Sequence, residues 1–113
     1  NKKSIQIWGN GKAKRELMYV DDVADACIFF MRKKTKHSLI NIGSGIEKSI
    51  EQYARFIIKK LGLKINIKFD KSKPNGTPRK ILNSQIANSY GWRANRTLDE
   101  GFDKVYQSYL LNY

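Results

Sequence analysis

Apolar and polar residues alternate along residues 4–8 and 64–69, which is the pattern expected of half-buried strands. The predicted extended segments cover residues 4–8, 16–20, 39–43, where the segment ends in a glycine turn, and 64–69. In the last of these strands, Ile65, Ile67 and Phe69 share one face, because successive side chains of a strand point to opposite sides.

Four other stretches carry apolar residues at helical spacing, namely 21–34, 49–62, 84–91 and 97–112. Two of these predicted helices begin with a capping box, formed by Ser49 with Gln52 and by Thr97 with Glu100. Gly62 stands where a C-terminal cap belongs. Strands that alternate with helices indicate the α/β class, and a chain of 113 residues fits a single domain spanning residues 1–113.

The helix predicted over 21–34 begins with acidic residues and ends with a basic run, which suits the helix dipole. Its predicted apolar stripe consists of Val23, Ala26, Cys27, Phe30 and Met31. We expect Cys27 to be a small buried side chain there and not a nucleophile. We interpret the carboxylates of Asp21, Asp22 and Asp25 as charge compensation at the helix start, without a catalytic role.

The composition is that of a folded chain, with 41% hydrophobic and 12% aromatic residues. Apolar runs are too short for a membrane-spanning helix, and the N-terminal residues lack the apolar core of a signal peptide. Because the sequence has no initiator methionine and starts just before a predicted strand, we expect a fragment of a longer protein. A single cysteine excludes an internal disulfide and fits a reducing, cytoplasmic compartment. With only one histidine besides, we expect no metal site.

The charge is strongly positive, since 22 lysines and arginines stand against 10 acidic residues and give a net charge of +12. A basic domain is the electrostatic footprint of a nucleic-acid-binding protein. The cations are scattered along the chain, however, and no zinc-finger or RRM-type pattern accompanies them. Nucleic-acid binding is therefore an alternative interpretation and not the first one.

Motifs of several enzyme classes are missing. Dinucleotide-binding folds carry G-x-G-x-x-G after their first strand, but the glycine clusters at 9–14 (GNGKAK) and 43–48 (GSGIEK) each lack the third glycine. A P-loop is missing too, and no Ser, His and acidic trio stands out. What remains are cations beside turns.

The loop at 72–81 (SKPNGTPRKI) places two prolines, a glycine and three cations in ten positions. Arg79 and Lys80 lie near its end, and Arg15 follows the first glycine cluster. Arginine and lysine suit phosphate binding, and a stiff loop reduces the entropy lost on binding. Trp8 precedes the same glycine cluster and can stack on a ring. Each of these features alone is equally typical of a solvated surface.

The order of the motifs resembles the GDP-L-fucose synthase family of the extended short-chain dehydrogenase/reductase superfamily. The resemblance rests on IWGNGKAKRELMYVDDVADACIFFM, INIGSG, SIEQYARFIIKKLG, FDKSKPNGTPRKIL, SYGW and TLDEGF, and it extends from Ile7 to about Tyr109. The R-E-x-x-x-V-D-D stretch is shared across much of the superfamily, whereas K-P-x-G-T-P-R-K is more specific. The resemblance implies the small substrate-binding, C-terminal domain of such an enzyme, without its N-terminal Rossmann core.

The resemblance also implies the ligand and the residues that contact it. Enzymes of this family convert GDP-4-keto-6-deoxymannose to GDP-L-fucose with NADPH. By the resemblance, Trp8, Arg15 and Lys80 match substrate contacts, and Arg79 matches an arginine that contacts phosphates in related enzymes. Asn75 stands where the family usually has an aspartate, and an asparagine there can keep a hydrogen bond but loses the charge.

Leu17 and Tyr19 stand where this family commonly has an aromatic residue and a histidine, and Tyr19 also occurs in sister branches. A neighbouring sugar-nucleotide epimerase, dehydratase or reductase therefore stays open.

The resemblance places NADP(H) and the catalytic Ser and Tyr-x-x-x-Lys on the other half of the enzyme. Tyrosine is nowhere followed by lysine four positions later in this sequence. We therefore expect no bound cofactor and no oxidoreductase activity of this chain alone. Phe29, Phe30 and Met31 on helix 21–34 would then be partly exposed, and we expect a homo-oligomer or a chain completed by the Rossmann half.

Overall fold

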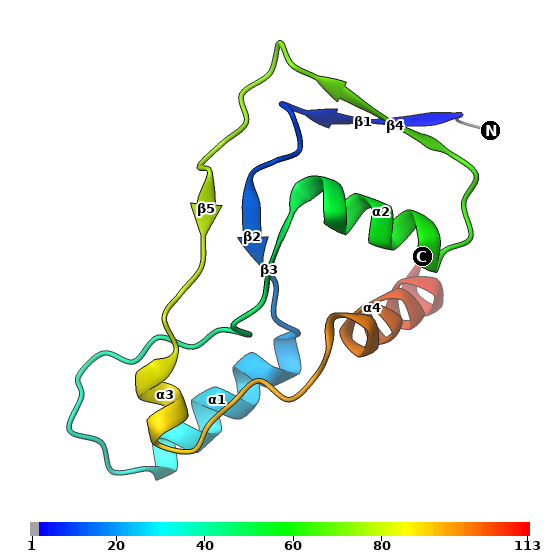
Figure 1. Ribbon diagram of the computed structural model, residues 1–113. Coiled ribbons are helices and arrows are strands. Elements are labelled where there is room, and N and C mark those ends of the chain that lie inside the picture. Colours follow the sequence, from blue (N-terminus) through cyan, green and yellow to red (C-terminus); the bar gives the residue numbers. More distant parts are fainter. Residues whose placement is uncertain (1–2) are drawn as a thin grey trace. The chain divides into compact units, whose positions relative to one another are not determined.

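The computed structural model describes residues 3–113 (Figure 1). Two units are distinguished along the chain. The first consists of the chain up to Arg15 together with Glu47–Ile81, and the second consists of Glu16–Ile46 and Leu82–Tyr113. The first unit contains strands and a helix and the second contains helices, and together they confirm the α/β class. That the chain forms a single domain stays a prediction.

Two parallel strands and one helix build most of the first unit. Strand β1 (Ser4–Trp8) pairs with β4 (Asn66–Asp70). Isoleucine side chains face the unit interior in both strands, and all of them are half-buried, as the alternating pattern predicted. Helix α2 (Ile50–Lys60) has the predicted capping box between Ser49 and Gln52. Gly62 follows the helix with a φ of 62°, so the predicted C-terminal cap is confirmed.

A second sheet in the order β3-β2-β5 was only partly anticipated by the sequence. Strand β2 covers Lys14–Glu16, and the prediction of a strand over 16–20 is wrong, because helix α1 already begins at Val20. The flanking strands β3 (Glu47–Ser49) and β5 (Arg79–Lys80) were not predicted. Two or three residues are too few to show a period of two, so only the tertiary pairing reveals such strands.

Helices α1 (Val20–Arg32), α3 (Gln85–Ser89) and α4 (Leu98–Asn112) form the second unit. Its core contains Ala26, Ala87 and Trp92, around which Met18, Phe29, Phe30, Ile40, Ile42 and Ala94 are packed half-buried. The prediction of a strand over 39–43 is wrong, because this segment is irregular in the structure. Two of its isoleucines, Ile40 and Ile42, still pack half-buried on the core, although the segment is not part of a sheet.

The buried side of α1 differs from the predicted stripe. Asp22 and Ala26 are buried, while Phe29 and Phe30 are half-buried. Cys27 is exposed, so the prediction that it is a buried side chain is wrong. Each residue turns a helix by about 100°, and a stripe that includes position 22 leaves Cys27 outside the packed face.

Asp22 has a larger role than charge compensation at a helix start. Its side chain is only 2% exposed. One carboxylate oxygen accepts a hydrogen bond of 2.8 Å from Nη1 of Arg96, and the other accepts one of 3.1 Å from the Arg96 backbone N–H. The hydrogen bonds to Asp22 and to Asp25 raise the pKa of Arg96. This ion pair ties α1 to the segment before α4, which no local pattern predicted.

None of the helices within residues 3–113 is both long enough and apolar enough to span a bilayer.

Candidate functional site

All five predicted site residues lie in the first unit. Trp8 ends β1, Arg15 occupies the middle of β2, Asn75 lies in the proline-glycine loop, and Arg79 and Lys80 form β5. The parallel pairing of β2 with β5 places Arg15 opposite Lys80. Pairing between two short strands therefore brings together cations that are 65 positions apart in the sequence.

Asp70 anchors the beginning of the loop. Its carbonyl oxygen accepts hydrogen bonds from the backbone N–H groups of Gly9 at 2.8 Å and Lys73 at 3.1 Å. Its carboxylate accepts from the backbone N–H and the hydroxyl of Ser72 on one oxygen, and from the Gln6 amide at 3.1 Å on the other. One residue thus fixes the turn against the end of β1.

Asn75 fastens the tip of the loop to the first glycine turn. Its Oδ1 accepts a hydrogen bond of 2.7 Å from the backbone N–H of Asn10. Gly9 has a φ of 74°, and a Cβ added there would lie 2.3 Å from Oδ1 of Asn75. The close approach therefore needs a glycine, and the Asn75 carbonyl oxygen already serves as a structural acceptor. That Asn75 contacts a ligand stays a prediction.

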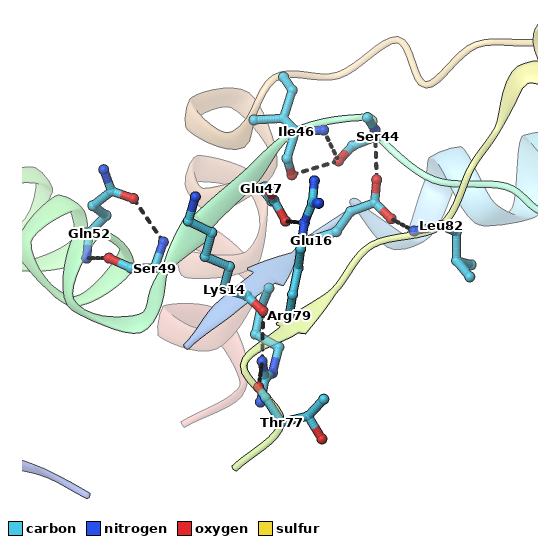
Figure 2. A network of polar contacts seen from close by, with 12 residues as sticks. Lys14, Glu16, Ser44, Ile46, Glu47, Ser49, Gln52, Thr77, Arg79 and Leu82 are labelled. Carbon is cyan, nitrogen blue, oxygen red and sulfur yellow. Dashed lines mark hydrogen bonds and ion pairs between the residues drawn. The ribbon is translucent and has the colours of Figure 1, made fainter. Parts of the chain in front are cut away.

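Arg15 ties the end of the loop to β2. Its Nη1 donates hydrogen bonds to the carbonyl oxygens of Lys14 at 2.6 Å and Thr77 at 2.7 Å, and Lys14 and Thr77 are labelled in Figure 2. The Lys14 backbone N–H donates to the carbonyl of Pro78 at 2.8 Å. A guanidinium has five N–H donors in a fixed plane, and these bonds therefore set the orientation of the whole group.

Arg79 is paired with Glu47, a residue that the sequence analysis did not single out. Nε of Arg79 donates a hydrogen bond of 2.8 Å to Oε2 of Glu47 (Figure 2). This hydrogen bond lowers the pKa of Glu47 and raises the pKa of Arg79. The two residues are 32 positions apart, so no local signal connected them. Lys80, the neighbouring cation, is exposed.

The loop is an open surface and not a closed cavity, because residues 71–80 are all exposed. Trp8 is 65% exposed at its edge, and the ammonium of Lys73 lies 5.5 Å from the centre of the indole. An exposed ring beside a cation suits a ligand that combines an aromatic or sugar ring with phosphate groups.

Neither glycine cluster fits a dinucleotide phosphate. In the first, a side chain at Gly11 would meet the ring of Phe69 at 2.4 Å, so the chain itself fills the space beside this turn. In the second, a side chain at Gly43 would lie 2.6 Å from the carboxylate of Glu16, which also accepts the Gly45 backbone N–H at 2.7 Å. A carboxylate in this place repels a phosphate, and we derive no NADP contact from this chain.

The comparisons with known proteins agree with the resemblance. Residues 1–43 match the NAD dependent epimerase/dehydratase family. A GDP-L-fucose synthase of Sinorhizobium fredii is 42% identical over 108 residues, which are 96% of this chain and 34% of the relative. A GDP-L-colitose synthase of Yersinia pseudotuberculosis is 38% identical over 112 residues, 98% of this chain and 36% of the relative. The chain spans about a third of the length of the curated relatives it matches.

A solved structure extends the agreement to the fold. The GDP-mannoheptose C4 reductase of Campylobacter jejuni, determined with NADP bound, superimposes with a TM-score of 0.83 at 31% identity. The match covers 96% of this chain and 35% of the reductase. The α/β fold of one part of such enzymes and the resemblance to the GDP-L-fucose synthases are both confirmed.

Replacing Gly9 with alanine tests the contact between the loop tip and the glycine turn. We expect Gly9→Ala to lower the free energy of unfolding by clearly more than Gly62→Ala. Both glycines have a positive φ, which costs an L-residue about 1–2 kcal/mol, but only Gly9 lies against another residue, since a Cβ at Gly62 meets nothing within 4 Å. Urea unfolding measures both variants, and equal losses would contradict the contact.

The ion pair between Glu47 and Arg79 predicts a pH dependence. Its hydrogen bond holds the pKa of Glu47 below the ordinary value of 4.5. A carboxylate with a lowered pKa stabilises the fold above its ordinary pKa, and this contribution disappears as the pH falls through the folded-state pKa. We expect Glu47→Gln to be less stable than the wild type at neutral pH, with the difference vanishing below 4.5.

The pH profile has an internal control. Arg79→Gln removes the same pair from the other side, so it should lose stability over the same pH range. Urea unfolding at a series of pH values measures all three proteins. A stability difference that persists unchanged into strong acid would show that the ion pair is not its source.

Proposed function

Since the chain is similar over nearly its whole length to one part of the GDP-L-fucose synthases, we propose that it is the GDP-sugar-binding part of an enzyme of this kind. The whole enzyme would convert GDP-4-keto-6-deoxymannose to GDP-L-fucose with NADPH. The observation that carries the proposal is the placement of Trp8, Arg15, Asn75, Arg79 and Lys80 together in the first unit.

The proposed site divides the ligand between two kinds of contact. Arg15 and Lys80 lie opposite each other on paired strands, and they would bind the diphosphate by a planar fork and a point charge. Trp8, exposed at the edge of β1, would stack on the base or the sugar. The hydrogen bonds of Asp70 and Asn75 hold the loop in place before the ligand arrives, and less entropy is therefore lost on binding.

Hydride transfer is assigned to the half of the enzyme that carries the cofactor. NADPH supplies the hydride in the whole enzyme, and the residues of this chain would bind and orient the sugar nucleotide. Two kinds of synthase match the chain, a GDP-L-fucose synthase at 42% identity and a GDP-L-colitose synthase at 38%. Asn75 stands in place of an aspartate, and a different GDP-sugar is therefore the second candidate for the substrate of the whole enzyme.

A fluorescence titration tests the ligand. Saturable quenching by GDP over UDP is expected, in the millimolar range that corresponds to about −4 kcal/mol. Lys80→Ala should weaken GDP binding about tenfold, because a hydrogen bond to a charged group contributes about 1.5–3 kcal/mol. Lys68→Ala, an exposed lysine on β4 of the same unit, removes the same charge and serves as the matched control.

The same titration with a short single-stranded RNA tests the alternative based on net charge. If RNA alone binds, and its affinity falls steeply with salt, the positive charge and not the sugar-nucleotide site determines the function. Equal effects of Lys80→Ala and Lys68→Ala on GDP binding would also contradict the proposal.

Catalysis by the isolated chain is tested separately. We expect no oxidation of NADPH when the 113-residue chain is mixed with a GDP-4-keto-sugar, as followed at the absorbance of the reduced nicotinamide. NADPH oxidation that survives further purification would contradict the assignment of hydride transfer to the cofactor-binding half. The result of the GDP titration does not depend on this outcome.

The exposed apolar side chains of α1 suggest a partner. Met31 is 85% exposed, and Val20 and Ile28 are also exposed. We propose that a second copy of the chain or the cofactor-binding half covers them. Light scattering should show self-association at high concentration, which Met31→Lys should reduce, and a clean monomer at high concentration would count against the proposal.

A further inference from the structure

Lys73 and Trp8 form a pair that no pattern in the sequence connects. The indole is 65% exposed, and Nζ of Lys73 lies 5.5 Å from its centre. This distance is within the range of a cation–π interaction, in which the negative face of the ring attracts a cation.

The position of Lys73 follows from the pairing of β1 with β4. Trp8 is the register partner of Asp70. Because the backbone N–H of Lys73 donates to the carbonyl of Asp70 at 3.1 Å, the turn folds back toward the end of β1. Asp70 also binds Ser72 through its carboxylate. The turn therefore fixes the backbone of Lys73 near the end of β1, and this places its side chain within reach of the indole.

We propose that Lys73 is a specificity-determining residue of the Trp8 surface, which selects ring ligands that carry an anionic group over neutral ones. A ring that stacks on this face of the indole displaces the ammonium and loses the cation–π interaction. An anionic ligand regains the charge interaction by binding the displaced ammonium, and a neutral ligand does not. The inference rests on the proposed function. The ligand class is a nucleoside diphosphate or a nucleoside diphosphate sugar.

The pair itself is tested without any nucleotide. Iodide, an anion, and acrylamide, a neutral molecule, both quench exposed tryptophan. Trp92 is 5% exposed, so the quenching reports mainly on Trp8, and a Trp8→Phe variant gives the residual contribution of Trp92. Lys73→Gln should lower the ratio of iodide to acrylamide quenching, and Lys73→Arg should keep it.

Lys71→Gln is the matched control, since Lys71 is an exposed lysine in the same turn and its loss changes the net charge equally. If Lys73→Gln and Lys71→Gln lower the quenching ratio equally, Lys73 is not paired with Trp8 and the inference is overturned.

The selectivity is tested by titrating GDP and guanosine. In Lys73→Gln, the preference for GDP over guanosine should fall about two- to fivefold, the size expected of an exposed cation–π interaction. Lys73→Arg should retain the preference, and Lys71→Gln should change it by less. A preference that falls equally in the two glutamine variants overturns the inference. If the wild type binds neither ligand, the proposed function and the ligand part of this inference both fail, while the quenching ratio still decides whether the pair exists.

Discussion

The candidate site depends on the hydrogen bonds that Asp70 makes at the end of β4. Its carbonyl and carboxylate together bind Gln6, Gly9, Ser72 and Lys73, so the loop leaves the sheet in a fixed direction. Two prolines restrict the backbone within the loop, but they do not set the direction in which the loop leaves the sheet. The anchor at Asp70 directs the loop along the glycine turn, where Asn75 can reach the backbone of Asn10.

Local charge at the site is more balanced than the net charge of +12 suggests. Arg79 is neutralised in part by Glu47, and one nitrogen of Arg15 is bound to backbone carbonyls. These bonds orient the two guanidinium groups, whereas the exposed lysines of the loop remain point charges on flexible side chains. The surface thus combines oriented hydrogen-bond donors with mobile charges. Oriented donors suit the fixed geometry of a phosphate group, and mobile charges can follow a ligand that binds in more than one position.

The roles of several residues became visible only in the tertiary structure. Glu47 lies on a three-residue strand, and its partner is on a two-residue strand, so neither element has a readable period. Asp22 looked like an ordinary acidic residue at a helix start, and the structure shows it buried against Arg96. The prediction that Cys27 is buried was wrong because it considered apolar residues alone. The packed face of α1 includes the buried carboxylate of Asp22, which leaves Cys27 exposed.

The sequence by itself determined the helices, their caps, the strands β1 and β4 and the α/β class. Patterns among residues a few positions apart mark these features, and their spacing is written in the chain. The motifs also carried the resemblance that the comparisons confirmed. Only the tertiary structure decided which cations face each other, which of them have acidic partners and where Lys73 lies. Such contacts join residues from 32 to 74 positions apart, and they form only when the chain has folded and its strands have paired.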